Sequence, residues 1–254
     1  PVLNEVRDKA FEDFRRQGFP TKKVERYKYT DMQKLFEPDY GLNLNRLEIP
    51  VNPYDTFKCD VPNLSTSLYF IVNDQFYSKS LPKAKLNDGV IVDSLNHVAT
   101  ERPELVAKYY GRLANTEADA ITALNTMLAQ DGLFIYVPKN VQLERTIQVI
   151  NILRSDVDLM VNRRVLIVLE EGAKAQFLFC DHAADDRNFL ATQVIEAYVG
   201  ANANLELNCL EETHAKNVRV SNVYIEQQRD SRASHNVITL HNGVTRNMLD
   251  LVFK

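Results

Sequence analysis

The sequence predicts a mainly β protein in which a parallel β-helix, or β-solenoid, follows a smaller helical and mixed part. Two observations lead to this fold class. No convincing helical pattern occurs from residue 133 to the end, and similar segments recur there at intervals of 28 and 30 residues. Stacked solenoid turns place like residues above one another, whereas a β-sandwich or jelly roll, the alternative with alternating strands, requires no fixed interval.

The composition is that of an ordinary folded protein. The 254 residues are 45% hydrophobic and 25% charged, with a net charge of −4, which argues against intrinsic disorder and against nucleic-acid binding by bulk positive charge. No apolar run is long enough to span a membrane. Cys59, Cys180 and Cys209 are too few for a disulfide framework, so we expect a reducing compartment and a cytoplasmic protein.

The two ends of the sequence carry an expectation of their own. The chain begins at Pro1 without Met, which leaves open whether a leader preceded it. The last residues alternate like a strand up to Lys254, with no cap or polar tail after them. We therefore expect a fragment of a longer protein, with a β-helix that is incomplete at its C-terminal end.

The first element in order is a helix with one apolar stripe at three- and four-residue spacing. Gly18 and Pro20 are expected to end it, glycine as a left-handed cap and proline as a stop. A short helix through Phe36 follows, with Thr30 as its expected N-cap. The apolar stripe of the first helix comprises Leu3, Val6, Ala10, Phe11 and Phe14.

An extended region with short strands comes next. Strands are predicted over residues 67–72, 75–78 and 90–92, because these runs are rich in β-branched, aromatic and alternating residues. The prolines that interrupt regular structure before them are Pro38, Pro50, Pro53 and Pro62.

Two helices complete the first part of the chain. Pro103 suits the first position of a helix over residues 104–110. Thr116 is the expected N-cap of a helix over residues 117–129. The pattern then changes from mixed to all-β, near Asp131.

This change predicts a domain boundary. Residues 1–130 form an N-terminal helical and mixed domain, and residues 131–254 form the β-helix core domain.

Each repeat of the core domain consists of a strand, a tight corner and a second strand. Corners are predicted at Gly172, Gly200 and Asp230, with a weaker fourth copy at Asn140. Small residues follow each of the first three corners, and an isoleucine precedes each by five residues. These isoleucines are Ile167, Ile195 and Ile225. Stacking them on successive turns would bury a continuous apolar column, which one turn alone could not do.

The motifs of several enzyme classes are absent. The sequence has no GxxxxGK[ST], GxGxxG or GxSxG, so it does not indicate a nucleotide hydrolase, a dinucleotide enzyme or an α/β-hydrolase.

Cysteines and histidines offer a possible metal site. Cys180 with His182, and Cys209 with His214, could approach one another on stacked turns and bind iron, zinc or copper. We favour the interpretation that both cysteines are small buried residues. His235 falls on the inward phase of its strand and is interpreted as a hydrogen-bonded core histidine. We assign no catalytic, cofactor-binding or metal-binding residue.

Two other groups of polar residues have alternative interpretations. Acidic pairs near the corners could act with arginines on a polysaccharide, as in secreted β-helix enzymes, but we favour solvated turn residues. Tyr27 and Tyr29 lie among lysines and arginines and could stack on a nucleic acid, although a helix surface explains them equally well. The residues of the first group are Asp156, Asp158, Asp185, Asp186, Arg163 and Arg164.

Several segments resemble one known family. Residues 18–31, GFPTKKVERYKYTD, and residues 131–138, DGLFIYVP, resemble the opening motif and the start of the core domain of the SufB/SufD family of iron–sulfur cluster assembly proteins. Residues 200–203 and 230–236 resemble that family's coil corners. The likeness extends from about residue 10 to the end, and the RYKYT run favours the SufD branch over the SufB branch.

The resemblance implies a right-handed parallel β-helix flanked by helical domains, and a scaffold subunit without enzymatic activity. Such subunits pair with a SufB-like subunit and a SufC-like ABC ATPase, and can form homodimers. An iron–sulfur cluster or iron would belong to the full complex. The family's later Cys-x-His motif and ATPase-docking helices are not in this sequence, and Cys180-Asp-His182 is followed by Ala-Ala, so no metal role is carried over to it.

Two functional hypotheses therefore stand. The first is a non-enzymatic scaffold subunit of an iron–sulfur assembly complex, acting through protein contacts and with no nucleic-acid or membrane partner. The alternative is a polysaccharide-active β-helix enzyme, a lyase or a hydrolase.

Overall fold

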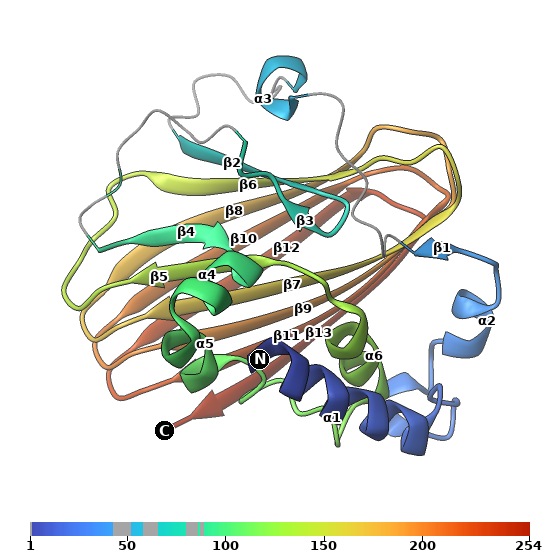
Figure 1. Cartoon of the computed structure of the whole chain (residues 1–254), viewed down its shortest axis with the longest axis horizontal. Helices are drawn as coiled ribbons and strands as arrows, with labels where there is room; N and C mark the ends of the chain where they lie inside the picture. Colours follow the sequence, from blue (N-terminus) through green and yellow to red (C-terminus); the bar gives the residue numbers. More distant parts are fainter. Residues whose placement is uncertain (1, 43–51, 58–65, 80–85, 87–88) are drawn as a thin grey trace.

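Successive strands of the C-terminal half alternate between two parallel sheets. A computed structural model of the chain describes residues 2–42, 52–57, 66–79, 86 and 89–254. In this part the two sheets form the walls of a flattened solenoid, with helices against one wall (Figure 1). The predicted mainly β class and the β-solenoid are confirmed.

Every regular element from residue 133 to the end is a strand, as predicted. These strands are β5 (Leu133–Val137), β6 (Thr146–Leu153), β7 (Leu159–Leu169), β8 (Lys174–Ala183), β9 (Phe189–Val199), β10 (Asn204–Glu212), β11 (Asn217–Gln227), β12 (Arg232–His241) and β13 (Val244–Phe253). Odd-numbered strands form sheet A, in the order β13-β11-β9-β7-β5, and even-numbered strands form sheet B, in the order β12-β10-β8-β6. Neighbours within each sheet run parallel, so each pair of consecutive strands makes one turn of the solenoid.

The positions of the corners show that the predicted repeat is out of phase at one corner. Asn140, Gly172, Asn202 and Asp230 have positive φ angles of 62°, 69°, 58° and 58° and occupy equivalent places on successive turns. The corner equivalent to Gly172 is therefore Asn202, and the prediction of Gly200 was wrong by two residues. The similar runs GAKA and GANA caused this error. The equivalent residues share a left-handed backbone conformation and not a similar sequence. Gly, Asn and Asp occupy these corners because they adopt left-handed φ most readily.

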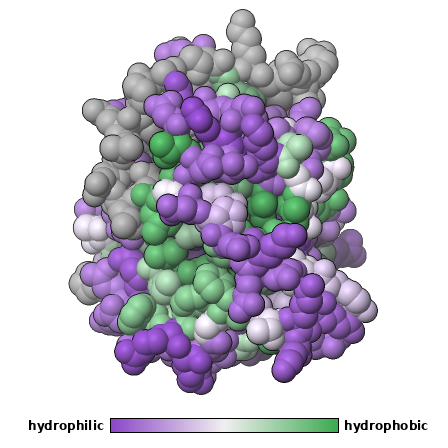
Figure 2. Space-filling model, turned by 90° about the vertical axis from the view of Figure 1, so that its right-hand side faces the viewer, coloured by the Kyte–Doolittle hydropathy of each residue, from purple (hydrophilic) through white to green (hydrophobic). Residues whose placement is uncertain are grey.

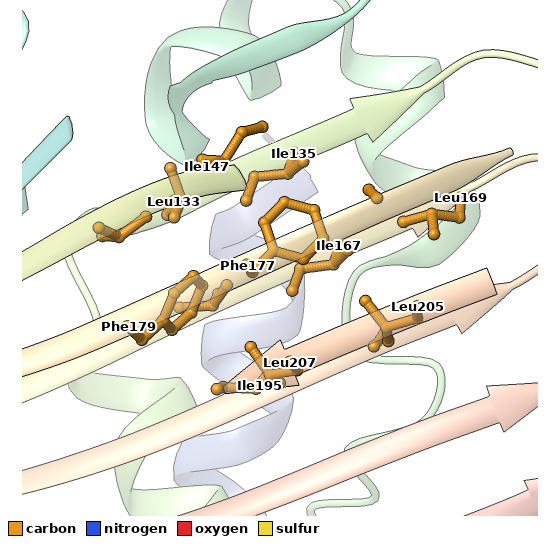
Figure 3. Close-up of a cluster of buried hydrophobic side chains, with 14 of the residues drawn as sticks. Leu133, Ile135, Ile147, Ile167, Leu169, Phe177, Phe179, Ile195, Leu205 and Leu207 are labelled. Atoms are coloured by element: carbon orange, nitrogen blue, oxygen red, sulfur yellow. The ribbon is translucent and has the colours of Figure 1, made fainter. Parts of the chain in front are cut away.

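The isoleucines predicted to stack on one another are also out of register, for the same reason. Ile195 lies level with Val165 and Val223 on the neighbouring strands. All three point into the interior between the sheets and are buried. The adjacent column, two residues further along the strands, contains Ile167, Ala197 and Ile225. Figure 3 shows how isoleucines of sheet A meet phenylalanines and leucines of sheet B in this interior. The predicted apolar core is confirmed, although the three isoleucines belong to two columns.

Four helices lie on the outer side of sheet A (Figure 1). They are α1 (Val2–Gln17), α4 (Leu95–Glu101), α5 (Pro103–Tyr109) and α6 (Ala120–Leu128). Outward-facing Leu166 and Val168 of β7 pack against Leu95, Val98 and Val106 of these helices. Both faces of sheet A are therefore buried, which agrees with its nearly continuous apolar strands.

The N-terminal segment follows the prediction with two exceptions. Gly18 has a φ of +64° and ends α1, as expected. Phe11 of the predicted apolar stripe is 50% exposed. Helix α2 (Met32–Phe36) has Asp31 rather than Thr30 as its N-cap, because the Asp31 carboxylate accepts a hydrogen bond from the backbone N–H of Lys34.

The helix predicted over residues 117–129 also begins later than expected. Its N-cap is Asp119, whose carboxylate accepts from the backbone N–H of Thr122. Thr116 does not cap the helix. Its hydroxyl instead donates to the buried Asp13 carboxylate at 2.6 Å, which ties this loop to α1.

Strands from the first part of the chain extend both sheets. The three predicted short strands are present as β2 (Thr66–Val72), β3 (Gln75–Phe76) and β4 (Ile91–Ser94). Strand β2 pairs in parallel with β6, and β4 pairs antiparallel with β5. Helix α4, directly after β4, was not predicted. The boundary between residues 1–130 and 131–254 stays a prediction, since sheet pairing crosses it.

The remaining short elements are β1 (Gly41–Leu42), which pairs with β7, and α3 (Pro53–Thr56), which begins at a proline. Cys59, Pro50 and Pro62 lie outside the described residues.

Candidate functional site

The two cysteines that suggested a metal site lie on opposite faces of sheet B. Cys209 is level with Phe179, and Cys180 is level with Leu210. Because successive strand residues point to opposite faces, Cys209 faces the solenoid interior and Cys180 faces outward, where it packs with Phe70. The strand geometry therefore does not bring the two thiols into one site.

The histidines of that hypothesis are separated in the same way. The ring of His182 lies on the outer side against Phe57, with centroids 5.1 Å apart. His214 sits at a corner, with its Nε2 2.9 Å from the carbonyl oxygen of Asp185. Among the described residues, no group of three or more His, Cys, Asp and Glu side chains is placed to hold a metal ion.

Cys209 and His235 form an interior pair near the last turn. Cys209 Sγ is 3.8 Å from His235 Nε2, and His235 lies on the inward phase, as predicted. Burial raises the pKa of the Cys209 thiol to about 12. Burial, and then the positive charge of Arg219, lower the pKa of His235. Both shifts favour the neutral groups, so this thiol is not poised as a nucleophile or a metal ligand.

A layer of charged residues crosses the interior beside this pair. Arg163 of sheet A donates to Asp181 of sheet B at 3.0 Å, and Arg219 approaches the other oxygen of Asp181 at 3.1 Å. Arg219 also pairs with Glu211 on the next turn. Two cations and two anions, each less than a tenth exposed, therefore balance one another in a space closed to water. We name these four residues the interior charge layer.

The interior charge layer shifts the pKa of Asp181. Burial acts to raise the pKa of this carboxyl, but Arg219, Arg163 and a hydrogen bond from Asn151 outweigh it, so the pKa is lowered. Asp181 is therefore ionised at neutral pH and holds both arginines. This arrangement fixes the stacking of successive turns and leaves no unpaired carboxyl for acid–base chemistry.

Glu211 connects the interior charge layer to the last turn of the solenoid. Its carboxylate accepts hydrogen bonds from Thr239 at 2.9 Å, Thr245 at 3.1 Å and Asn247 at 3.2 Å. These residues come from both β12 and β13. One buried carboxylate thus adds side-chain hydrogen bonds to the backbone pairing of the two final strands.

A second buried ion pair joins sheet A to the helices. Arg164 donates to Glu196 at 2.6 Å, and both side chains are fully buried. Glu196 also accepts from the backbone N–H groups of Gly111, Leu113 and Ala114 in the loop after α5. Arg163 and Arg164 therefore face opposite sides of β7, and neither lines an open cleft as the polysaccharide hypothesis would require.

Three of the four predicted corner carboxylates, Asp158, Asp185 and Asp186, accept hydrogen bonds from residues of neighbouring corners. A hydrogen bond from the Asn188 side chain, and a second from its backbone, lower the pKa of Asp158, and Lys216 lowers the pKa of Asp186. A general acid needs a raised pKa, so these shifts oppose that role. The corner at residues 154–158 adjoins β1. Figure 2 shows the side of the molecule that carries β1, on which polar residues are interspersed with apolar ones.

The RYKYT run has a structural role that the sequence did not reveal. In the 3-10 turn η1 (Glu25–Tyr27), Tyr27 is buried and donates to Asp119 at 2.6 Å, while Arg26 binds both carboxylate oxygens of Asp250 on β13, at 3.1 and 2.7 Å. The guanidinium of Arg246 lies 4.2 Å from the centre of the Tyr27 ring. Tyr27 is thus unavailable for stacking on a nucleic acid, and the segment fastens the N-terminal part to the last strand.

The last two strands, β12 and β13, carry several exposed apolar residues. These strands are the terminal members of their sheets in the described residues. Leu251 continues the inward column of Ile225, yet it is 46% exposed, whereas Ile225 is 1% exposed. The other exposed apolar residues on these two strands are Ile238, Leu240, Val244, Leu249, Val252 and Phe253.

Comparison with known families gives two matches that together cover nearly the whole chain. Residues 1–149 match the family described as "SufBD protein N-terminal region". Residues 151–254 match "SUF system FeS cluster assembly, SufBD core domain".

Individual relatives carry related names. The chain is 32% identical over 143 residues to a chloroplastic iron–sulfur cluster assembly SufBD family protein of Arabidopsis thaliana, 55% of this chain and 24% of the relative. It is 32% identical over 135 residues to a SufBD family protein of Synechocystis, 52% of this chain and 28% of the relative. It is 31% identical over 120 residues to the iron–sulfur cluster assembly protein SufD of Bacillus subtilis, 47% of this chain and 27% of the relative. The chain thus matches about a quarter of the length of these proteins.

Within the described residues, no helix is both long and apolar enough to cross a membrane.

Proposed function

This chain belongs to the SufBD family of iron–sulfur cluster assembly proteins, and from that premise we propose that it acts as a structural subunit without catalytic activity of its own. In this proposal the chain binds a SufB-like subunit through protein contacts, and a SufC-like ABC ATPase of the same complex hydrolyses ATP. Iron and the cluster are the cargo of the complex. A second copy of this chain is the alternative partner, in a homodimer. The proposed location is the cytoplasm, because sparse cysteines suit a reducing compartment.

The proposal rests on the family membership and on one observation, the pairing of the buried charged residues. Asp181 and Glu211 are paired with Arg163 and Arg219 in the interior charge layer. Glu196 is paired with Arg164 between sheet A and the helices. These carboxylates join neighbouring elements of the fold, which supports a structural role for them.

Copurification tests the proposal. The tagged 254-residue chain is produced together with the SufB-like and SufC-like proteins of the same genome, and the bound proteins are identified by mass spectrometry. We expect both partners with the wild-type chain.

The tag without the chain is the control, and it should recover neither partner. Absence of both partners from the wild-type sample would contradict the scaffold role itself.

A further inference from the structure

Helix α1 and the segment that follows it carry exposed aromatic side chains among basic ones. Phe11 is 50% exposed and Phe19 is 36% exposed. The centre of the Phe19 ring lies 5.2 Å from that of Phe14 and 5.0 Å from that of Phe36, so rings from α1 and α2 meet at one place. The guanidinium carbon of Arg15 lies 6.0 Å from the centre of the Phe11 ring. We name this surface the N-terminal patch; its members are Phe11, Arg15, Phe19, Lys22, Lys23 and Lys34.

Three lysines complete the N-terminal patch. The ammonium group of Lys22 lies 3.5 Å from a carboxylate oxygen of Asp31, the N-cap of α2, which places this lysine beside that helix. Lys23 and Lys34 are exposed, and their ammonium groups form no ion pair or hydrogen bond with a residue in the described part of the chain. Two cations on this surface are therefore available to a partner.

Positive charge is concentrated on this part of the chain. Residues 11–36 contain seven lysines and arginines and four aspartates and glutamates, a net charge of +3, whereas the whole chain has a net charge of −4. A positive surface attracts a negatively charged partner and repels a positive one. Half-exposed aromatic rings and arginine are also the residues that protein interfaces use most.

We propose that the N-terminal patch binds an acidic segment of a partner protein in which carboxylates alternate with apolar side chains. The carboxylates pair with Lys23 and Lys34, and the apolar side chains contact Phe11 and Phe19. A peptide is favoured over a nucleic acid because a net charge of +3 is small for phosphate binding and because Tyr27 is buried. This inference goes beyond the proposed scaffold function.

The test uses the purified 254-residue chain and a fluorescently labelled peptide of three Glu-Glu-Leu-Phe repeats. A peptide of Lys-Lys-Leu-Phe repeats inverts its charge, and a peptide of Glu-Glu-Ser-Ser repeats removes its apolar side chains. Fluorescence anisotropy measures binding. We expect saturable binding of the first peptide and binding weaker by about tenfold or more for the other two. Added salt should weaken the binding, because exposed charges are screened.

The lysines are tested by combining Lys23→Glu with Lys34→Glu, which should weaken binding of the acidic peptide by about tenfold or more because attraction becomes repulsion. The matched control combines Lys174→Glu with Arg232→Glu. It makes the same change in net charge at exposed positions of sheet B, and it should change binding far less. All four positions are exposed, so we expect both variants to fold, and circular dichroism checks this.

The apolar contact is tested by Phe11→Ala, which should weaken binding by about threefold or more. Leu240→Ala is its control, since Leu240 is 63% exposed on β12. Equal binding of the charge-inverted peptide would overturn the proposal, and so would unchanged binding in the double lysine variant or in Phe11→Ala. Tighter binding of oligothymidylate or of phosphatidylserine vesicles than of the acidic peptide would overturn it too. Copurification of the SufB-like and SufC-like proteins is measured separately, so a failure here is distinguishable from a failure of the scaffold role.

Discussion

Ile195→Asp is expected to unfold most of the protein at room temperature. Ile195 is completely buried between Val165 and Val223 in the interior of the solenoid. An aspartate there would lose the apolar contacts and bury a carboxyl without a partner, at a cost of about 5 kcal/mol or more. That amount is comparable to the whole stability of many domains. Urea unfolding followed by circular dichroism measures it.

Ile195→Val is the control for this variant, because it removes one methylene group and keeps the site apolar. It should cost only about 1 kcal/mol. If Ile195→Asp melted like the wild type, the column around residue 195 could not be part of the core.

Asp181→Ala is expected to cost about 3–5 kcal/mol, because it leaves Arg163 and Arg219 buried without their shared carboxylate. Asp158→Ala is the control at an exposed corner, where a much smaller loss of stability is expected than for Asp181→Ala. Both are measured by urea unfolding at neutral pH. A cost for Asp181→Ala no greater than that of Asp158→Ala would show that the interior charge layer does not hold the turns together.

The lowered pKa of Asp181 adds a pH dependence to this variant. A carboxyl whose folded-state pKa is depressed stabilises the protein at pH values above its unfolded pKa, near the ordinary 3.8. The stabilisation is lost as the pH falls through the folded-state pKa. Acidification below about pH 4 should therefore destabilise the wild type more than Asp181→Ala.

The solenoid could be predicted from the sequence because stacked turns require similar residues at regular intervals along the chain. Alternating apolar residues and small corner residues are local signals, and they recur once per turn. The predicted phase is wrong by two residues at one corner, because the similar runs at Gly172 and Gly200 do not reveal which residue adopts the left-handed backbone conformation. Asn202 takes the left-handed corner equivalent to Gly172, and Asn performs the same role there with a different side chain.

The polar contacts could not be predicted in the same way. Arg26 meets Asp250 across 224 positions of sequence, and Arg163 and Asp181 meet across two sheets. A charged residue in an apolar strand is normally interpreted as outward-facing, and only the fold reveals that its partner lies opposite. Helix α4 was missed for another reason, since seven residues after a strand carry too little periodic signal.

Methyl-to-methyl nuclear Overhauser contacts of Ile195 test the central claim, the stacking of successive solenoid turns in this register, most directly. In protein labelled at isoleucine and valine methyl groups, the structure predicts contacts from Ile195 to both Val165 and Val223, which lie level with it on the adjacent strands. Absence of both contacts would contradict the stacked solenoid and every inference that depends on it.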